Sequence, residues 1–223
     1  MDKFSWSDPP SQDAFPIARA GYPFIFASAF ITAVFALSEL VILALIGLVV
    51  SFFICYFFRD PDRVIPNKKC AIVSPADGKV ITVGKVDNSP AFEGVCLKIS
   101  IFMSVFNVHV NRIPHEGVIK KVCYYPGKFF PANLNKASEQ NEHNTISIKT
   151  KEGKEIYMVQ IAGLIARRII CKVQEGDKVG RGQRFGMICF GSRVDVYLPI
   201  ETKLSVAVGN KVKSGTSILG YLI

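Results

Sequence analysis

VQEGDKVGRG (residues 173–182) and VAVGNKVKSG (residues 206–215) are two copies of one pattern, V-x-x-G-x-x-V-x-x-G. A repeat of this kind predicts two equivalent structural units that share one core. Its glycines suit tight turns, where a positive φ costs glycine little. From residue 70 onward, short apolar runs alternate with Gly, Pro, Asn and Asp turns, which is typical of strands. We therefore expect a mostly-β domain over residues 70–223, with a hairpin about Glu152-Gly153 and a weak helical pattern only at 134–142.

The repeated pattern resembles the half-repeat of biotinyl and lipoyl carrier domains. Those domains are flattened β-sandwiches, or barrel-sandwich hybrids, whose halves are related by a pseudo-twofold axis. Their modified lysine lies ten residues after the second repeat glycine, at a hairpin tip. Here the residue ten positions after Gly182 is Ser192, and Gly191 precedes it. The resemblance implies a lipoyl-like fold that presents a Gly-Ser peptide at an exposed tip in place of the lysine.

A long apolar segment precedes this domain. Residues 21–58 contain one charged side chain, Glu39. A single helix needs only about 20 apolar residues to cross a bilayer, so we predict two short helices, about 22–37 and 40–58. They form a membrane anchor that either spans as a hairpin or dips in and returns. Residues 1–20 are then an N-terminal tail, and the charged, proline-containing residues 59–69 are a linker.

The distribution of charge suggests where this anchor sits. All but two of the 27 lysines and arginines follow residue 58, as do all but four of the 18 acidic residues. Positively charged flanks stay on the cytoplasmic side of a membrane. Beside an anchor, a basic domain favours anionic phospholipid as its partner over nucleic acid. We expect the β domain at the cytoplasmic face of a cell membrane.

Six scattered cysteines show no C-x-x-C pair and no histidine at zinc-ligand spacing. In a cytoplasmic domain we expect them to be reduced and packed, and we expect no metal site.

Five short motifs suggest an activity: FFRDPDR (57–63), SPADGKV (74–80), FNVHVNRIP (106–114), NEHN (141–144) and FGSRVD (190–195). Each is weak alone. Together, in this order, they resemble the phosphatidylserine decarboxylases, in the short bacterial form that depends on a pyruvoyl group. The resemblance extends from about residue 20 to the C-terminus.

This resemblance implies that the chain cleaves itself between Gly191 and Ser192. The Ser192 hydroxyl attacks the Gly191 carbonyl, and elimination then leaves a large chain (1–191) and a small chain (192–223) as a heterodimer. The small chain begins with a pyruvoyl group derived from Ser192, and no other cofactor is implied. A Schiff base between this group and the amine of phosphatidylserine provides the electron sink for loss of CO₂, giving phosphatidylethanolamine.

Serine needs activation by a base. The resemblance gives this role to His109 and Asp77, a pair in which a carboxylate would hold the imidazole. Longer bacterial members have a second histidine where this chain has Arg112. Whether His109 serves self-cleavage, decarboxylation or both therefore stays open.

The NEHN motif is a candidate for substrate binding through Glu142, His143 and Asn144, together with Arg112. The family commonly has NERN at this motif, so the histidine is a departure in a region expected to recognise phosphate. The alternative function is a non-catalytic lipoyl-like adaptor or carrier domain of a membrane complex.

Overall fold

The computed structural model describes residues 16–87, 94–128, 130–131, 140–163, 168–189 and 191–223. These fall into two compact units, residues 16–62 and residues 63–223. Most of the expected tail, residues 1–15, and most of the weak helical pattern, residues 134–139, lie outside the described residues.

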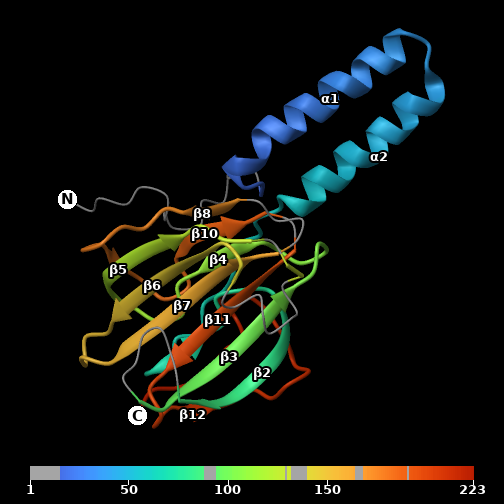
Figure 1. The fold of residues 1–223 in the computed structure, drawn as a ribbon. Coiled ribbons are helices and arrows are strands. Elements are labelled where there is room, and N and C mark those ends of the chain that lie inside the picture. The colour runs from blue at the N-terminus through green and yellow to red at the C-terminus, as the bar shows by residue number, and fades with distance from the viewer. Residues whose placement is uncertain (1–15, 88–93, 129, 132–139, 164–167, 190) are drawn as a thin grey trace. The chain divides into compact units, whose positions relative to one another are not determined.

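The first unit is an antiparallel helical hairpin of α1 (Tyr22–Leu37) and α2 (Val41–Phe57), which follows a 3-10 turn at Arg19–Gly21 (Figure 1). Both helices are apolar on all sides and most of their large side chains are exposed within this unit. A helix that is apolar all round belongs in a core or a membrane. The 19 residues from Arg19 to Leu37 are long and apolar enough to cross a bilayer.

Close packing holds the two helices together. A Cβ placed on Gly47 of α2 would lie 2.6 Å from Thr32 Oγ1 of α1. The same hydroxyl lies 3.4 Å from Ser51 Oγ on α2 and donates to the Ser28 carbonyl. Small residues and interhelical hydroxyl contacts of this kind stabilise helix pairs in lipid.

The second unit is built from fourteen described strands. An eight-stranded antiparallel sheet has the order β13-β2-β3-β11-β7-β6-β5-β9, and two three-stranded sheets have the orders β1-β14-β12 and β4-β10-β8 (Figure 1). The strands are β1 (Ala71–Val73), β2 (Gly78–Val86), β3 (Cys96–Met103), β4 (Val110–Arg112), β5 (Gly117–Tyr125), β6 (His143–Lys149), β7 (Glu155–Ala162), β8 (Ile169–Cys171), β9 (Lys178–Val179), β10 (Arg184–Ile188), β11 (Ser192–Leu198), β12 (Lys203–Leu204), β13 (Lys211–Val212) and β14 (Ile218–Tyr221). The predicted hairpin about Glu152-Gly153 is confirmed, because it joins β6 to β7.

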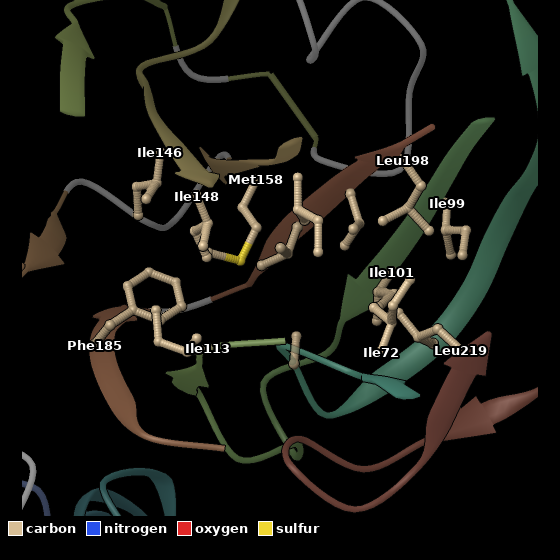
Figure 2. Packing of buried hydrophobic residues seen from close by; sticks show 14 of the residues in the cluster. Ile72, Ile99, Ile101, Ile113, Ile146, Ile148, Met158, Phe185, Leu198 and Leu219 are labelled. Carbon is tan, nitrogen blue, oxygen red and sulfur yellow. The ribbon is translucent and has the colours of Figure 1, made fainter. Parts of the chain in front are cut away.

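The main core lies between the large sheet and the two small sheets. Figure 2 shows Phe185 and Ile113 facing Ile146 and Ile148. Side chains alternate across a strand, so Val194, Val196 and Leu198 of β11 enter this core, while Arg193, Asp195 and Tyr197 occupy the other face of the sheet. All seven residues of β11 are buried, which makes it a central strand with no solvent-facing side.

The two sequence repeats adopt equivalent hydrogen bonding. Gly176 donates its N–H to the Ile119 carbonyl, and Gly209 donates to the Val80 carbonyl. Both glycines have positive φ, 89° and 95°. The strand of the first copy, β9, pairs with β5, and the strand of the second copy, β13, pairs with β2 at the opposite edge of the large sheet. The two copies therefore form equivalent turns and equivalent edge strands.

Candidate active site

Ser192 begins β11, where it is opposite Met103 of β3 and Ala162 of β7. Its exposed fraction is 0%, and its hydroxyl donates to Met103 Sδ at 3.4 Å. The expectation of an exposed tip is wrong for this residue. Ser192 is the first residue of the central strand, and its side chain lies on the core-facing side. Spacing along the chain does not reveal at which residue a strand begins to pair.

Gly191 has a φ of 69°, in the left-handed region. A Cβ added there would meet no atom within 4 Å. The position therefore requires glycine because of its backbone conformation. An added Cβ would have room there.

We expect Gly191→Ala to lower the free energy of unfolding by about 1–2 kcal/mol, the cost of a left-handed residue that carries a Cβ. The measurement is denaturant unfolding in a Ser192→Ala background, which is expected to keep the chain intact. Gly84→Ala is the matched control, because its Cβ would also meet open space and its φ lies outside the left-handed region. Equal effects of the two substitutions would contradict a backbone requirement at Gly191.

His109 lies just before β4 and is completely buried. Its Nδ1 is 2.9 Å from the Asn107 carbonyl oxygen. A carbonyl only accepts, so Nδ1 carries the proton and Nε2 has the lone pair. Nε2 accepts from the Gly191 N–H at 3.3 Å. The structure thus places the basic nitrogen of a neutral imidazole at the backbone N–H of Gly191, the residue whose carbonyl carbon forms the bond to Ser192.

Asp77 lies in the turn between β1 and β2 and makes different contacts. Its Oδ2 is 2.9 Å from Arg63 Nη2, and its Oδ1 accepts from the Ser214 backbone N–H at 2.7 Å. In the described part of the chain these hydrogen bonds do not join Asp77 to His109. The Asn107 carbonyl, which the sequence did not suggest, sets the imidazole tautomer instead.

The other candidate binding residues are spread over two sheets. Arg112 donates to the Gly182 carbonyl at 3.1 Å. His143 stacks on Tyr125, with ring centroids 4.8 Å apart, and donates from Nδ1 to the Asn141 carbonyl. Glu142 is 8% exposed. The described contacts of Arg112 and His143 are with residues other than Ser192.

Asn144 belongs to a chain of side-chain amides that the sequence analysis missed. Asn144 Nδ2 donates to Gln160 Oε1 at 3.1 Å, and Gln160 Nε2 donates to Asn111 Oδ1 at 2.8 Å. Asn111 Nδ2 then contacts Met103 Sδ at 3.8 Å, the sulfur that also accepts from Ser192. We call Asn144, Gln160 and Asn111 the carboxamide row. The sequence feature that could have revealed this row is Gln160, a polar residue at a core-facing position of β7 between Met158 and Ala162.

A buried ion cluster lies on the other face of β11. Arg193 donates twice to Asp195, at 2.6 and 2.9 Å, and once to Ser100 Oγ. Lys98 Nζ is 3.1 Å from the same carboxylate. Burial opposes the charge on Lys98, but attraction to Asp195 and Tyr197 leaves the pKa of this lysine raised. The cluster fixes the strand immediately after Ser192.

We expect Asp195→Asn to destabilise the protein by about 3–5 kcal/mol, because it leaves buried cations without their carboxylate. Urea unfolding of the Ser192→Ala background measures this. Lys98→Met, which removes a cation and keeps the Arg193–Asp195 pair, is expected to cost clearly less. Comparable losses for the two variants would show that the carboxylate does not organise the cluster.

None of the described residues form a group of three or more His, Cys, Asp or Glu side chains that could hold a metal ion.

Comparison with known proteins identifies the relatives of this chain. A sequence model of the family described as phosphatidylserine decarboxylase matches residues 50–220. A phosphatidylserine decarboxylase proenzyme from Desulfotalea psychrophila is 52% identical over 212 residues, which cover 95% of this chain and 99% of the relative. The proenzyme from Syntrophus aciditrophicus is 55% identical over 206 residues, 92% of this chain and 96% of the relative. The one from Geotalea uraniireducens is 49% identical over 207 residues, covering 93% and 97%.

Proposed function

The chain belongs to the phosphatidylserine decarboxylase family, and from this premise we propose how its own residues divide the work. Its activity is the decarboxylation of phosphatidylserine, and it is a proenzyme that makes its pyruvoyl group from its own chain. The observation that carries the assignment of residues is the contact of His109 Nε2 with Gly191, beside a buried serine that begins a central strand.

Self-cleavage begins when Ser192 Oγ attacks the Gly191 carbonyl carbon. A bond forms from Oγ to that carbon, the Gly191–Ser192 amide breaks, and an ester results. A base then removes the Ser192 α-proton, the Oγ–Cβ bond breaks, and Oγ leaves as part of the Gly191 carboxylate. The dehydroalanine that remains takes up water and loses ammonia, which gives the pyruvoyl end.

Three features of the site support this sequence. Ser192 is fully buried, so water is kept from hydrolysing the ester before elimination. Gly191 lacks a Cβ and holds a turned backbone at the carbonyl under attack. His109 has its lone pair on Nε2 and can take a proton there. Asp77 acts on this site indirectly, by holding Arg63 and the Ser214 backbone in place.

The residues around position 192 fit a pyruvoyl group, because a fully buried serine is paired on both sides, by β3 and by β7. When present, the group supplies the carbonyl that binds the substrate amine and accepts the electrons left by CO₂. The two neighbouring strands hold the end of β11. His109 Nε2, once it has taken up a proton, can return that proton to the substrate.

Pairing on both sides of β11 also supports the retention of both products as a heterodimer. The large chain keeps β3 and β7, and the small chain keeps β11 between them. Each product carries one copy of the repeat, so each half-core needs the other. The equivalent bonds of the two copies support a lipoyl-like barrel-sandwich architecture.

The proposed anchor is the helical hairpin, inserted from the cytoplasmic side with anionic phospholipid as its surface. Its helices of 16 and 17 residues are about 24–26 Å long, slightly less than a bilayer core of about 30 Å. This length favours insertion deep into the membrane with both ends on one side, near the lipid substrate.

We expect the purified protein to float with phosphatidylserine-containing vesicles. The triple substitution Ile42→Lys, Val49→Lys and Phe52→Lys, at exposed positions of α2, should leave it at the bottom of the gradient, because each charge costs about 3 kcal/mol in the membrane interior. Threonine at the same three positions is the matched control and should still float. Flotation of the lysine variant would contradict the proposed anchor.

The direct test of the substrate is product analysis. Purified enzyme in mixed micelles should convert phosphatidylserine to phosphatidylethanolamine, and the Ser192→Ala variant should not. Turnover by the alanine variant would overturn the assignment of the reactive group to Ser192.

A further inference from the structure

The carboxamide row ends at the sulfur atom that also accepts from the Ser192 hydroxyl. Asn111 Nδ2 and Ser192 Oγ both contact Met103 Sδ, at 3.8 and 3.4 Å. Asn111, Met103 and Ser192 all have an exposed fraction of 0%. The Asn111 amide and the reacting oxygen therefore share one sulfur atom as their acceptor, in a region shielded from water.

The row has a definite direction. Its donors run from Asn144 to Gln160, from Gln160 to Asn111 and from Asn111 to the sulfur. The opposite orientation would place Asn111 Oδ1 against a thioether, which has lone pairs but no proton to give. Successive hydrogen bonds polarise one another, so the last N–H of the row is a strong donor. In the described part of the precursor its contact is with a weak acceptor, the sulfur.

Self-cleavage changes the hydrogen bonds that Ser192 Oγ can make. As a hydroxyl, this oxygen donates a hydrogen bond to Met103 Sδ. As an ester oxygen it has no proton, and during elimination it gains negative charge as the Oγ–Cβ bond breaks. A donor aimed at an oxygen that develops charge stabilises the transition state.

We propose that Asn111, oriented by Gln160, donates from Nδ2 to Ser192 Oγ as this oxygen leaves. Until then Met103 Sδ accepts from both Asn111 Nδ2 and Ser192 Oγ. In this step the base takes the Ser192 α-proton, the electron pair forms the Cα–Cβ double bond, and Oγ keeps the pair from the broken Oγ–Cβ bond. The inference rests on the self-cleavage proposed above and assigns the donor for its second stage.

The test is to trap the ester with hydroxylamine while newly made precursor matures. Hydroxylamine cleaves the ester and releases a small chain that still begins with serine, whereas completed elimination gives a pyruvoyl end that hydroxylamine converts to its oxime with loss of water. Mass spectrometry measures the ratio of these two ends. In Asn111→Leu and Asn111→Val the elimination should slow about ten- to a hundredfold, the effect of losing a hydrogen bond to a charged acceptor, so the seryl end should accumulate.

A control variant separates this role from a packing role. Met158→Leu changes a buried side chain elsewhere in the core and should not accumulate the seryl end. If neither Asn111 variant folds, Gln160→Leu should shift the ratio in the same direction by a smaller factor, because it removes only the partner that orients Asn111.

A wild-type ratio of seryl to blocked ends in folded Asn111 variants, or in Gln160→Leu where those do not fold, would overturn this inference and leave self-cleavage intact. If wild-type protein gives neither a trapped ester nor a blocked end, the proposed self-cleavage itself fails.

Discussion

Replacing Ser192 with alanine is expected to leave a single chain of 223 residues, with no fragment 192–223 and no decarboxylase activity. The hydroxyl supplies both the nucleophile and the leaving oxygen, so its loss stops the reaction at the first bond. Its only described hydrogen bond is to a thioether, a weak acceptor. The fold should therefore persist, and intact mass together with a denaturing gel measures the result.

The matched control is Ser205→Ala, in the same part of the chain after β12, where the described hydrogen bond is made by the backbone N–H. This variant should split as the wild type does. Ser192→Cys keeps a nucleophile at the same position and should split at a changed rate. A Ser192→Ala protein that still yields the small chain would show that another residue or a protease cuts the bond.

Replacing His109 with glutamine is expected to slow self-cleavage by about 10²–10⁴-fold, the usual contribution of a positioned acid–base group. Glutamine can donate to the Asn107 carbonyl and accept from Gly191, so it imitates the hydrogen bonds of His109. It has no basic nitrogen to take a proton. The measurement is the first-order rate at which the precursor splits after synthesis.

His115 offers a matched control for this substitution. It is also buried, at 3% exposed, and its Nδ1 donates to a backbone carbonyl, that of Glu116. His115→Gln should split at nearly the wild-type rate. Decarboxylation measured per cleaved molecule of His109→Gln then separates the two roles, because a second loss there means that His109 also serves the substrate. Unchanged splitting of His109→Gln would exclude it as the base.

Much of the fold was predictable because the signals are local. Glycines at fixed spacing in residues 173–182 and 206–215 predicted equivalent turns, and these form with the same hydrogen bonds. The apolar run predicted two helices of nearly the observed lengths. The family resemblance, carried by five short motifs, is confirmed by the relatives.

The parts that escaped prediction depend on contacts between distant residues. Gln160 meets Asn111 across 49 positions of the chain, and Asp77 meets Ser214 across 137. A strand pattern indicates that Gln160 faces the core but not which polar group it meets there. The burial of Ser192 likewise follows from β3 and β7, the two strands that flank β11. The spacing of residues in the sequence does not predict which strands become neighbours.

The most direct measurement of the central claim is the mass of the small chain in purified wild-type protein. The account predicts two chains, 1–191 and 192–223, with the smaller one lighter than its seryl peptide by one ammonia and reactive toward carbonyl reagents. An uncut, active polypeptide would contradict it. So would a small chain that retains a free seryl N-terminus, because simple hydrolysis of the bond creates no carbonyl.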